Sequence, residues 1–156
     1  MEKIIPAAQS LELLGLPYKL FEHSQPPESL EEAARQREQS PGQIIRSIVL
    51  RLAEGQFIMV LIAGPGQVSW KRIRAALGVS RISMASEAEV LAVTGFVRGA
   101  VTPLGLPHPL RILADESVFV HDEISIGSGV RGVAIILKST DLQSALNQIE
   151  MGKFAV

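Results

Sequence analysis

Two neighbouring apolar runs constrain the fold most. They read Ile-Ile-Arg-Ser-Ile-Val-Leu-Arg-Leu over residues 44–52 and Gln-Phe-Ile-Met-Val-Leu-Ile-Ala over residues 56–63. Apolar runs of this length, rich in β-branched residues, are typical of buried strands. The three residues between them, Ala-Glu-Gly, are enough to connect two antiparallel strands. We therefore predict a hairpin over residues 43–63 at the centre of a sheet.

Short helices are predicted from their start and stop signals. Pro6 suits a first helical turn, and Ser29, Ser69 and Ser86 each precede a segment in the manner of an N-cap. Gly78 ends one of these segments in the manner of a C-cap. The expected helices cover residues 6–14, 29–36, 70–77, 86–93 and 140–149.

Further short strands are expected on either side of the central hairpin. Residues 17–23 partly alternate and predict an edge strand, and the C-terminal third predicts strands near residues 111–113, 118–120, 124–126 and 133–137. The fold class is therefore α/β, with a mixed, barrel-like sheet flanked by short helices. With 156 residues, 47% of them hydrophobic, the chain is expected to form a single domain over residues 1–156.

Composition narrows the classes of function. The net charge of −1 argues against a protein that wraps long nucleic acid by charge alone, but it allows a small contact with the end of one. The absence of cysteine excludes a disulfide scaffold, a zinc–thiolate site and a cysteine nucleophile. No stretch has the apolar length of a signal peptide or a membrane span. We expect a soluble, cytoplasmic protein that does not bind membranes.

Glycine and proline are most concentrated over residues 94–109, which read Thr-Gly-Phe-Val-Arg-Gly-Ala-Val-Thr-Pro-Leu-Gly-Leu-Pro-His-Pro. A solvent-exposed linker would be more polar, so this loop is expected to pack against the domain. Glycines allow a ligand to approach the backbone, while prolines stiffen the path between them. Such a loop either crosses a sheet edge as a purely structural connection or presents its N–H groups to a ligand.

Arg46 interrupts the first apolar run of the hairpin. A cation among apolar strand residues needs compensation. Arg46 therefore lies on a solvated face, pairs with a buried carboxylate, or binds a phosphate, a carboxylate or a terminal nucleotide. From the sequence alone these alternatives stay open.

The remaining polar candidates give weaker signals. The three histidines lie in separate segments without metal-ligand spacing, so no metal site is expected, although His108 lies between two prolines of the glycine-rich loop. The Gly127-Ser128-Gly129 run lacks a phosphate-loop lysine and is typical of a turn. Lys71 and Arg74 lie on one side of a predicted helix. They form either an ordinary solvated helix face or a small patch that contacts phosphates.

Taken together, these segments resemble the YbaK and prolyl-tRNA synthetase-associated family of aminoacyl-tRNA editing domains. The resemblance covers nearly the full chain, and its segments follow one another in the family's order. They are residues 15–18 (Gly-Leu-Pro-Tyr), 43–50, 69–78, 84–91 with Thr94 and Gly95, the Gly-x-x-x-Pro element at 99–103, and 124–132 with Asp141 and Leu142.

The resemblance implies a deacylase that acts in trans and hydrolyses the ester of a mischarged tRNA, such as tRNA(Pro) carrying Cys, Ala or a similar small amino acid. It implies no cofactor and no protein nucleophile. Its implied partners are the aminoacylated 3′ end of a tRNA and an aminoacyl-tRNA synthetase, with the protein as a monomer or homodimer. The implied catalytic residues are Arg46, Gly99, Ala100, Val101, Thr102 and Pro103. The implied substrate-binding residues are Gly127, Ser128, Gly129, His108, Lys71 and Arg74.

The sequence departs from the family at one position. Most members carry a lysine where this chain has Arg46, which keeps the charge but changes its shape. Two other interpretations therefore stay open: a binding module of the same fold without catalysis, and an esterase for aminoacyl compounds other than tRNA. A panel of mischarged tRNAs and small aminoacyl esters distinguishes the three.

Overall fold

The structure is a computed structural model that describes residues 3–156. Its helices are α1 (Pro6–Leu13), α2 (Leu30–Gln36), α3 (Trp70–Leu77), α4 (Glu87–Thr94) and α5 (Ser139–Ala145). Its strands are β1 (Lys19–Glu22), β2 (Ile45–Leu52), β3 (Phe57–Ala63), β4 (Ile82–Met84), β5 (Arg111–Asp115), β6 (Glu123–Gly127), β7 (Val133–Lys138) and β8 (Ile149–Gly152). Short 3₁₀ turns are η1 (Pro41–Gln43), η2 (Ala53–Gly55) and η3 (Glu116–Phe119).

The predicted hairpin is confirmed at the centre of the larger sheet. Its strands β2 and β3 pair antiparallel in a sheet with the order β4-β2-β3-β5-β8. Met59 and Leu61 of β3 contribute to one hydrophobic cluster, whereas Ile58, Val60 and Ile62 contribute to another on the opposite face. Because successive side chains of a strand point to opposite faces, a strand buried on both sides needs a continuous apolar run, as β3 has.

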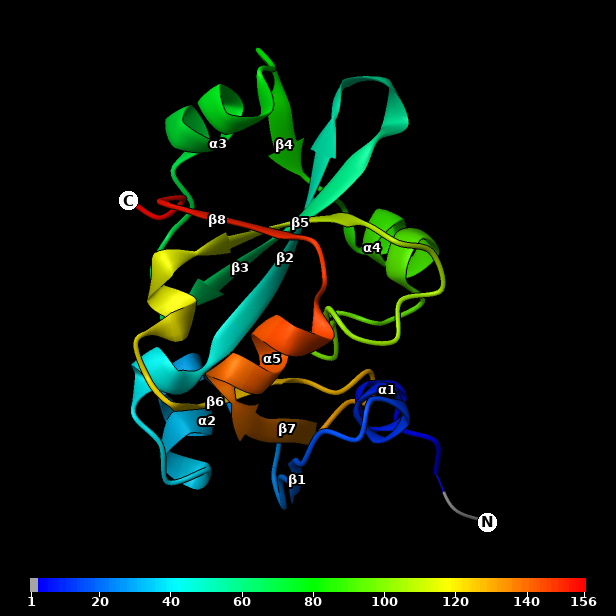
Figure 1. Cartoon of the computed structure of the whole chain (residues 1–156), viewed down its shortest axis with the longest axis vertical. Coiled ribbons are helices and arrows are strands. Elements are labelled where there is room, and N and C mark those ends of the chain that lie inside the picture. Colours follow the sequence, from blue (N-terminus) through cyan, green and yellow to red (C-terminus); the bar gives the residue numbers. More distant parts are fainter. Residues whose placement is uncertain (1–2) are drawn as a thin grey trace.

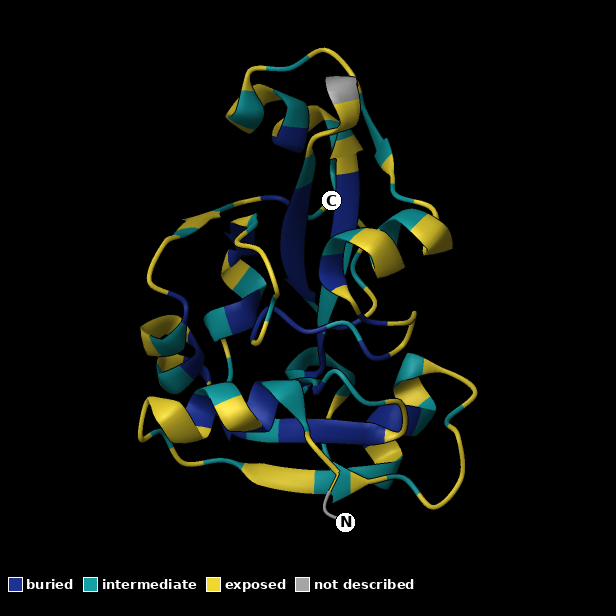
Figure 2. Cartoon of the chain, turned by 90° about the vertical axis from the view of Figure 1, so that its right-hand side faces the viewer, coloured by how far each residue is buried: buried dark blue, intermediate teal, exposed yellow. Residues whose placement is uncertain are grey.

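A second sheet holds the strands β1, β7 and β6 in that order. It lies below the larger sheet in Figure 1, and β1 forms its exposed edge in Figure 2, as predicted. The two sheets meet at an isolated parallel bridge between Ile44 and Ser125. The mixed α/β class is confirmed, but neither sheet closes, so the barrel-like sheet of the prediction is replaced by two open sheets with a shared core.

The helix starts follow the predicted caps. The hydroxyls of Ser29, Ser69 and Ser86 accept hydrogen bonds from the backbone N–H three residues later, at 3.0, 3.3 and 3.1 Å. At Ser86 the cap is reciprocal, because the Glu89 side chain accepts a hydrogen bond from the N–H of Ser86. The corresponding Glu32 does not return such a bond to Ser29 but accepts from the N–H of Glu28. No helix in residues 3–156 is long and apolar enough to cross a membrane.

Three elements of the C-terminal half differ from the prediction. The strand expected at residues 118–120 is η3, because the Asp115 carboxylate accepts from the N–H of Ser117 at 3.0 Å and starts a turn there. The helix expected to reach Ile149 ends at Ala145, and Ile149 begins β8. The three-residue strand β4 was missed because a strand that short has little pattern.

Asp115 also fixes the end of the chain. Its carboxylate accepts from the N–H groups of Phe154 and Ala155 at 2.7 and 3.0 Å. Burial raises the pKa of Asp115, but its hydrogen bonds with Ser117, Phe154 and Ala155 outweigh burial and lower this pKa below its usual value.

Candidate active site

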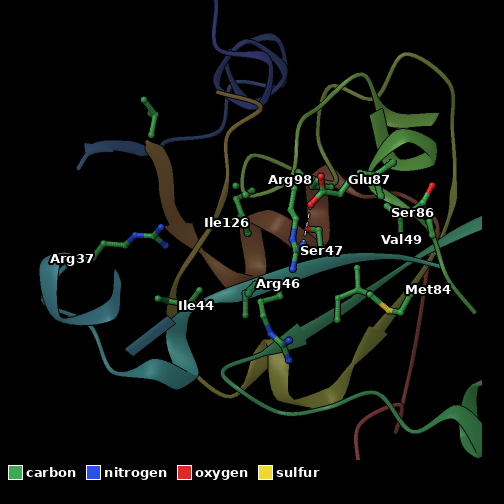
Figure 3. A pocket seen from close by; sticks show the side chains of 18 residues that line it. Arg37, Ile44, Arg46, Ser47, Val49, Met84, Ser86, Glu87, Arg98 and Ile126 are labelled. Atoms are coloured by element: carbon green, nitrogen blue, oxygen red, sulfur yellow. Dashed lines mark hydrogen bonds and ion pairs between the residues drawn. The ribbon is translucent and has the colours of Figure 1, made fainter. Parts of the chain in front are cut away.

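A cavity lies in the gap between the two sheets. Strand β4 pairs only with residues 50–52 of β2, so in the described chain residues 45–48 have no strand partner on that side. The cavity runs along this free edge and has a volume of about 640 Å³, a size typical of small-ligand pockets. It is lined by Arg37, Ile44, Ile45, Arg46, Ser47, Ile48, Val49, Met84, Ala85, Ser86, Glu87, Val90, Arg98, Gly99, Val101, Ile126, Gly127 and Val133 (Figure 3).

The glycine-rich loop supplies one wall of the cavity, through Gly99 and Val101. Gly99 has a φ of +88°, a left-handed conformation that favours glycine. Ala100 is buried, and it holds the loop because its N–H donates to the Val97 carbonyl and its carbonyl accepts from Gly129, at 3.0 and 2.9 Å. In the described chain the N–H groups of Gly99 and Val101 have no hydrogen-bond partner, so both are free to donate to a ligand.

The rest of the predicted Gly-x-x-x-Pro element supports this wall from behind. Thr102 and Pro103 are buried and do not line the cavity. The Thr102 hydroxyl accepts from the N–H of Leu104 at 3.2 Å, which keeps the chain turned after the loop. A direct catalytic contact of Thr102 and Pro103 stays a prediction.

Gly127 lines the cavity where β6 passes against the loop. A Cβ atom at Gly127 would lie 2.1 Å from the carbonyl oxygen of Val101, so any residue other than glycine would clash with the loop. Glycine is therefore required here because strand and loop approach each other so closely.

The neighbouring predicted residues, Ser128 and Gly129, lie outside the cavity lining. Ser128 is fully buried; its hydroxyl donates to the Val133 carbonyl at 2.7 Å and accepts from the N–H of Val130 at 3.1 Å. Gly129 has a positive φ and lies against Pro6 and Phe96. Both residues shape the turn after β6.

Arg46 is satisfied by backbone carbonyls. Its register partner is Ile62, which places its side chain on the face of β2 opposite to Ser47 (Figure 3). Its Nε donates to the carbonyl of Gly64 at 2.8 Å, and its Nη2 donates to that of Gly66. Burial lowers the pKa of Arg46. Arg46 is thus at the cavity, but its charge is compensated by the turn after β3, an arrangement absent from the sequence-based alternatives.

Ser47 is the polar side chain that points from β2 toward the cavity, and the sequence analysis missed it. Its Oγ is the one buried side-chain polar atom in the described chain without a hydrogen-bond partner. Such a group costs free energy unless a ligand or water satisfies it. A serine next to Arg46 in β2 gives little signal in the sequence, because strands often carry single polar residues.

Arg37 was also missed, although it lines the cavity. It directly follows α2 and donates hydrogen bonds to His23 and Ser125. Its position depends on a contact between residues 88 positions apart, which no local pattern indicates.

The other predicted binding residues lie away from the cavity. His108 is exposed and is not part of its lining. Arg74 lines a second, more open groove together with Arg51 and Arg81, whereas Lys71 is exposed on α3 and lines neither hollow. No cluster of metal-ligating side chains exists among residues 3–156.

The cavity can bind and polarise a carbonyl. It offers two unpartnered N–H donors on the loop and one unpartnered hydroxyl on β2. No histidine occurs among its lining residues in the described chain, and its one lining carboxylate, Glu87, is paired with Arg98 at 3.0 Å. The arrangement suits attack by water on an already activated acyl group.

The sequence comparison assigns the family. A family model described as the aminoacyl-tRNA editing domain matches residues 25–145. The chain belongs to this family. The matched range contains every residue that lines the cavity, and the resemblance read from the sequence is confirmed.

Two curated relatives of this editing-domain protein have assigned functions. The proline–tRNA ligase of Trichlorobacter lovleyi is 34% identical over 84 residues, which are 54% of this chain and 15% of the ligase. The multifunctional Ser/Thr-tRNA deacylase ProXp-y of Escherichia coli K12 is 33% identical over 87 residues, which are 55% of this chain and 52% of the deacylase. The chain therefore spans about half the length of the deacylase and a small part of the ligase.

Solved structures share the whole fold. A candidate trans-editing enzyme for prolyl-tRNA synthetase matches with a TM-score of 0.85 at 22% identity, over 99% of both chains. The hypothetical protein APE2540 matches with a TM-score of 0.86 at 19% identity, over 96% of this chain and 98% of its own. At these identities the likeness shows the fold alone.

Proposed function

We propose that this editing-domain protein is a deacylase that acts in trans on mischarged aminoacyl-tRNA and hydrolyses the ester of the wrong amino acid. The observation that carries the proposal is the pair of unpartnered N–H groups at Gly99 and Val101 beside the cavity. Family membership gives this geometry its substrate class.

In the proposed reaction the ester carbonyl lies against the loop. When water attacks the carbonyl carbon, negative charge develops on the carbonyl oxygen, and the N–H groups of Gly99 and Val101 stabilise it. Collapse of the tetrahedral intermediate breaks the ester bond, releases the amino acid and returns a proton to the ribose oxygen. Because an aminoacyl ester is already activated, positioning and charge stabilisation supply the rate without a protein nucleophile.

Ser47 and Arg46 are proposed to hold the substrate. The Ser47 hydroxyl gains the hydrogen bond that it lacks in the empty protein when a ribose hydroxyl or the α-amino group lies beside it. Arg46 contacts the terminal nucleotide only if its guanidinium leaves the carbonyls of Gly64 and Gly66. To bind the substrate, Arg46 must therefore give up hydrogen bonds within the protein, whereas Ser47 gives up none.

The proposed partners follow from the substrate. Lys71 and Arg74 of α3 are proposed to contact phosphates of the acceptor stem, and a synthetase is the source of the mischarged tRNA. We place the protein in the cytoplasm, where tRNA is charged, as one domain over residues 1–156. Binding roles for His108, Ser128 and Gly129 remain predictions.

The amino acid removed is the finer part of the proposal. The name of the Escherichia coli relative points to Ser and Thr, whereas the resemblance to prolyl-tRNA synthetase-associated domains points to Cys or Ala on tRNA(Pro). The test is a deacylation panel that combines these four esters with cognate Pro-tRNA. Turnover of at least one mischarged ester above that of Pro-tRNA supports the proposal, and no turnover of any of them refutes it.

One observation favours a second candidate, a tRNA-binding module without catalysis. The guanidinium of Arg46 lines the cavity, but it already donates to the backbone carbonyls of Gly64 and Gly66, so its charge is compensated before any ligand binds. Tight binding of tRNA without turnover in the same panel would establish this second candidate.

A further inference from the structure

Arg37 lies at the end of the cavity where the two sheets meet. In Figure 3 its side chain extends from the end of α2 toward the cavity, while Arg98 and Glu87 lie on the other side. Ser125, which Arg37 contacts, is the residue that bridges to Ile44 and joins the sheets. The guanidinium therefore lies where the two sheets are joined.

Neutral groups hold this guanidinium in place. Its Nε donates to Nε2 of His23 at 3.1 Å, and its Nη1 donates to Oγ of Ser125 at 2.9 Å. Because arginine only donates, Nε2 of His23 must accept, and its Nδ1 donates to Oε1 of Gln36 at 2.6 Å. The Ser125 hydroxyl in turn donates to Oε1 of Gln39 at 2.9 Å. These contacts orient Arg37 but leave its charge uncompensated.

The charge of Arg37 has no counterion in the described chain. None of the ion pairs between described residues includes Arg37. Burial lowers the pKa of Arg37 to about 10, so the side chain remains a cation at neutral pH. Two of its five N–H donors are used by His23 and Ser125, which leaves three for another partner.

A structural role alone does not account for this arrangement. His23 and Ser125 need only neutral donors, which an amide side chain would provide without the cost of a half-buried charge. A planar, preorganised guanidinium with free donors is instead suited to bind an oxyanion through two parallel hydrogen bonds. An aminoacylated tRNA end carries phosphodiesters as its only anionic groups.

We propose that Arg37 binds a phosphate group of the ligand, and that the phosphodiester on the 5′ side of the terminal nucleotide supplies it. This inference rests on the proposed function for the source of the phosphate. It sets the direction of the substrate: the phosphate lies at Arg37 where the sheets meet, and the ester lies at the glycine-rich loop. Arg37 is a binding residue in this account and takes no part in bond breaking.

The first experiment measures nucleotide binding without any reaction. AMP and adenosine differ only in the 5′ phosphate, so their dissociation constants are compared by calorimetry for the wild type, Arg37→Gln and Arg35→Gln. Arg35 is the matched control because it lies two residues away and its side chain is 78% exposed. We expect the wild type and Arg35→Gln to bind AMP about 10- to 100-fold more tightly than adenosine, and Arg37→Gln to bind both equally.

Two results would overturn the inference. One is equal affinity of the wild type for AMP and adenosine. The other is a loss of adenosine affinity in Arg37→Gln as large as its loss of AMP affinity, which would mark a structural role. If Arg37→Gln does not fold, Arg37→Lys takes its place, because it keeps the charge but loses the fork, and at least a severalfold loss of the AMP preference is then expected.

A second experiment separates tRNA from free phosphate as the source. Aminoacyl-adenosine and its 5′-phosphorylated form are compared as deacylation substrates, with inorganic phosphate as competitor. We expect Arg37→Gln to lower kcat/KM about 10- to 100-fold for the phosphorylated ester and by a much smaller factor for the ester without the phosphate. Competition by inorganic phosphate as strong as by AMP would refute the assignment to a nucleotide-borne phosphate. If no ester is hydrolysed but AMP binding depends on Arg37, the proposed function fails and the phosphate site stands.

Discussion

Replacing Gly127 with alanine tests whether the contact between strand and loop shapes the site. The added Cβ would lie 2.1 Å from the carbonyl oxygen of Val101 and 3.2 Å from that of Ala100. Real Cβ contacts are almost never shorter than 3.0 Å, so the loop or the end of β6 must move by about 1 Å. Both are parts of the backbone, and neither can yield by a change of rotamer.

The cost follows from this displacement. Overpacking of a well-packed region costs about 1–3 kcal/mol of stability. A displacement of about 1 Å in groups that position a substrate lowers the rate by roughly a hundredfold. We therefore expect Gly127→Ala to lower the free energy of unfolding by about 2 kcal/mol and kcat/KM for the edited ester by about 100-fold.

Urea denaturation and steady-state deacylation measure the two effects. Gly66→Ala is the matched control, because its Cβ would meet its nearest neighbours at ordinary distances of 3.5 and 3.6 Å and its φ is not positive. Both substitutions restrict the unfolded chain alike, so their difference isolates the collision. Gly127→Ala with the stability and turnover of Gly66→Ala would refute the argument.

Three further predictions concern other parts of the molecule. Arg46→Ala removes two charge-assisted hydrogen bonds to backbone carbonyls, so it should lower the free energy of unfolding by about 2 kcal/mol in urea melts, and Arg46→Lys should lower it less. An unchanged unfolding midpoint would place Arg46 in solvent. Asp115→Ala should cost about 3 kcal/mol, because three N–H groups lose their acceptor. Folding lowers the pKa of Asp115, so the Asp115 carboxylate stabilises the protein above the pKa of about 3.8 that it has in the unfolded chain, and this stabilisation is lost as the pH falls further. Acid should therefore destabilise the wild type more than Asp115→Ala, and equal acid sensitivity would contradict this. Replacing Lys71 and Arg74 with glutamine should weaken tRNA binding and reduce the slope of log K against log salt by about 1–2, and an unchanged slope would assign both to an ordinary solvated face.

Local signals predicted the helices and the central hairpin well. A serine cap such as Ser86 or a C-terminal glycine such as Gly78 acts within one turn, so the residues that fix the boundary are neighbours in the sequence. The continuous apolar run of β3 likewise carries its own explanation, because burial on both faces demands it.

Elements that depend on distant partners were not predictable in this way. Ile149 begins a strand because β8 lies parallel to β5, where it pairs with Ile112. The local sequence pattern predicted one helix over residues 140–149 and contains no sign of that pairing. The two sheets also fail to close into a barrel for a non-local reason, since the backbone pairing recorded between them in the described chain is the isolated bridge of Ser125 with Ile44, just before β2.

The site shows the same division. The glycine-rich loop was predicted to pack against the domain because its composition is unusual for a linker, and the family resemblance implied its role at the site; Gly99 and Val101 do line the cavity. Arg37 and Ser47 were missed, because an arginine after a short helix and a serine in a strand look ordinary until the fold surrounds them. Arg46 stood out in the sequence, but the carbonyls that satisfy it belong to a turn about 20 residues later.

The proposed deacylation places the aminoacyl ester in this cavity, against the backbone of the glycine-rich loop. A crystal structure with a non-hydrolysable 3′-amide analogue of aminoacyl-AMP would show where the acyl group binds. We expect the acyl carbonyl oxygen about 3 Å from the N–H nitrogen of Gly99 or Val101. An analogue bound outside the cavity, or inside it with its carbonyl directed away from both N–H groups, would refute the proposed site.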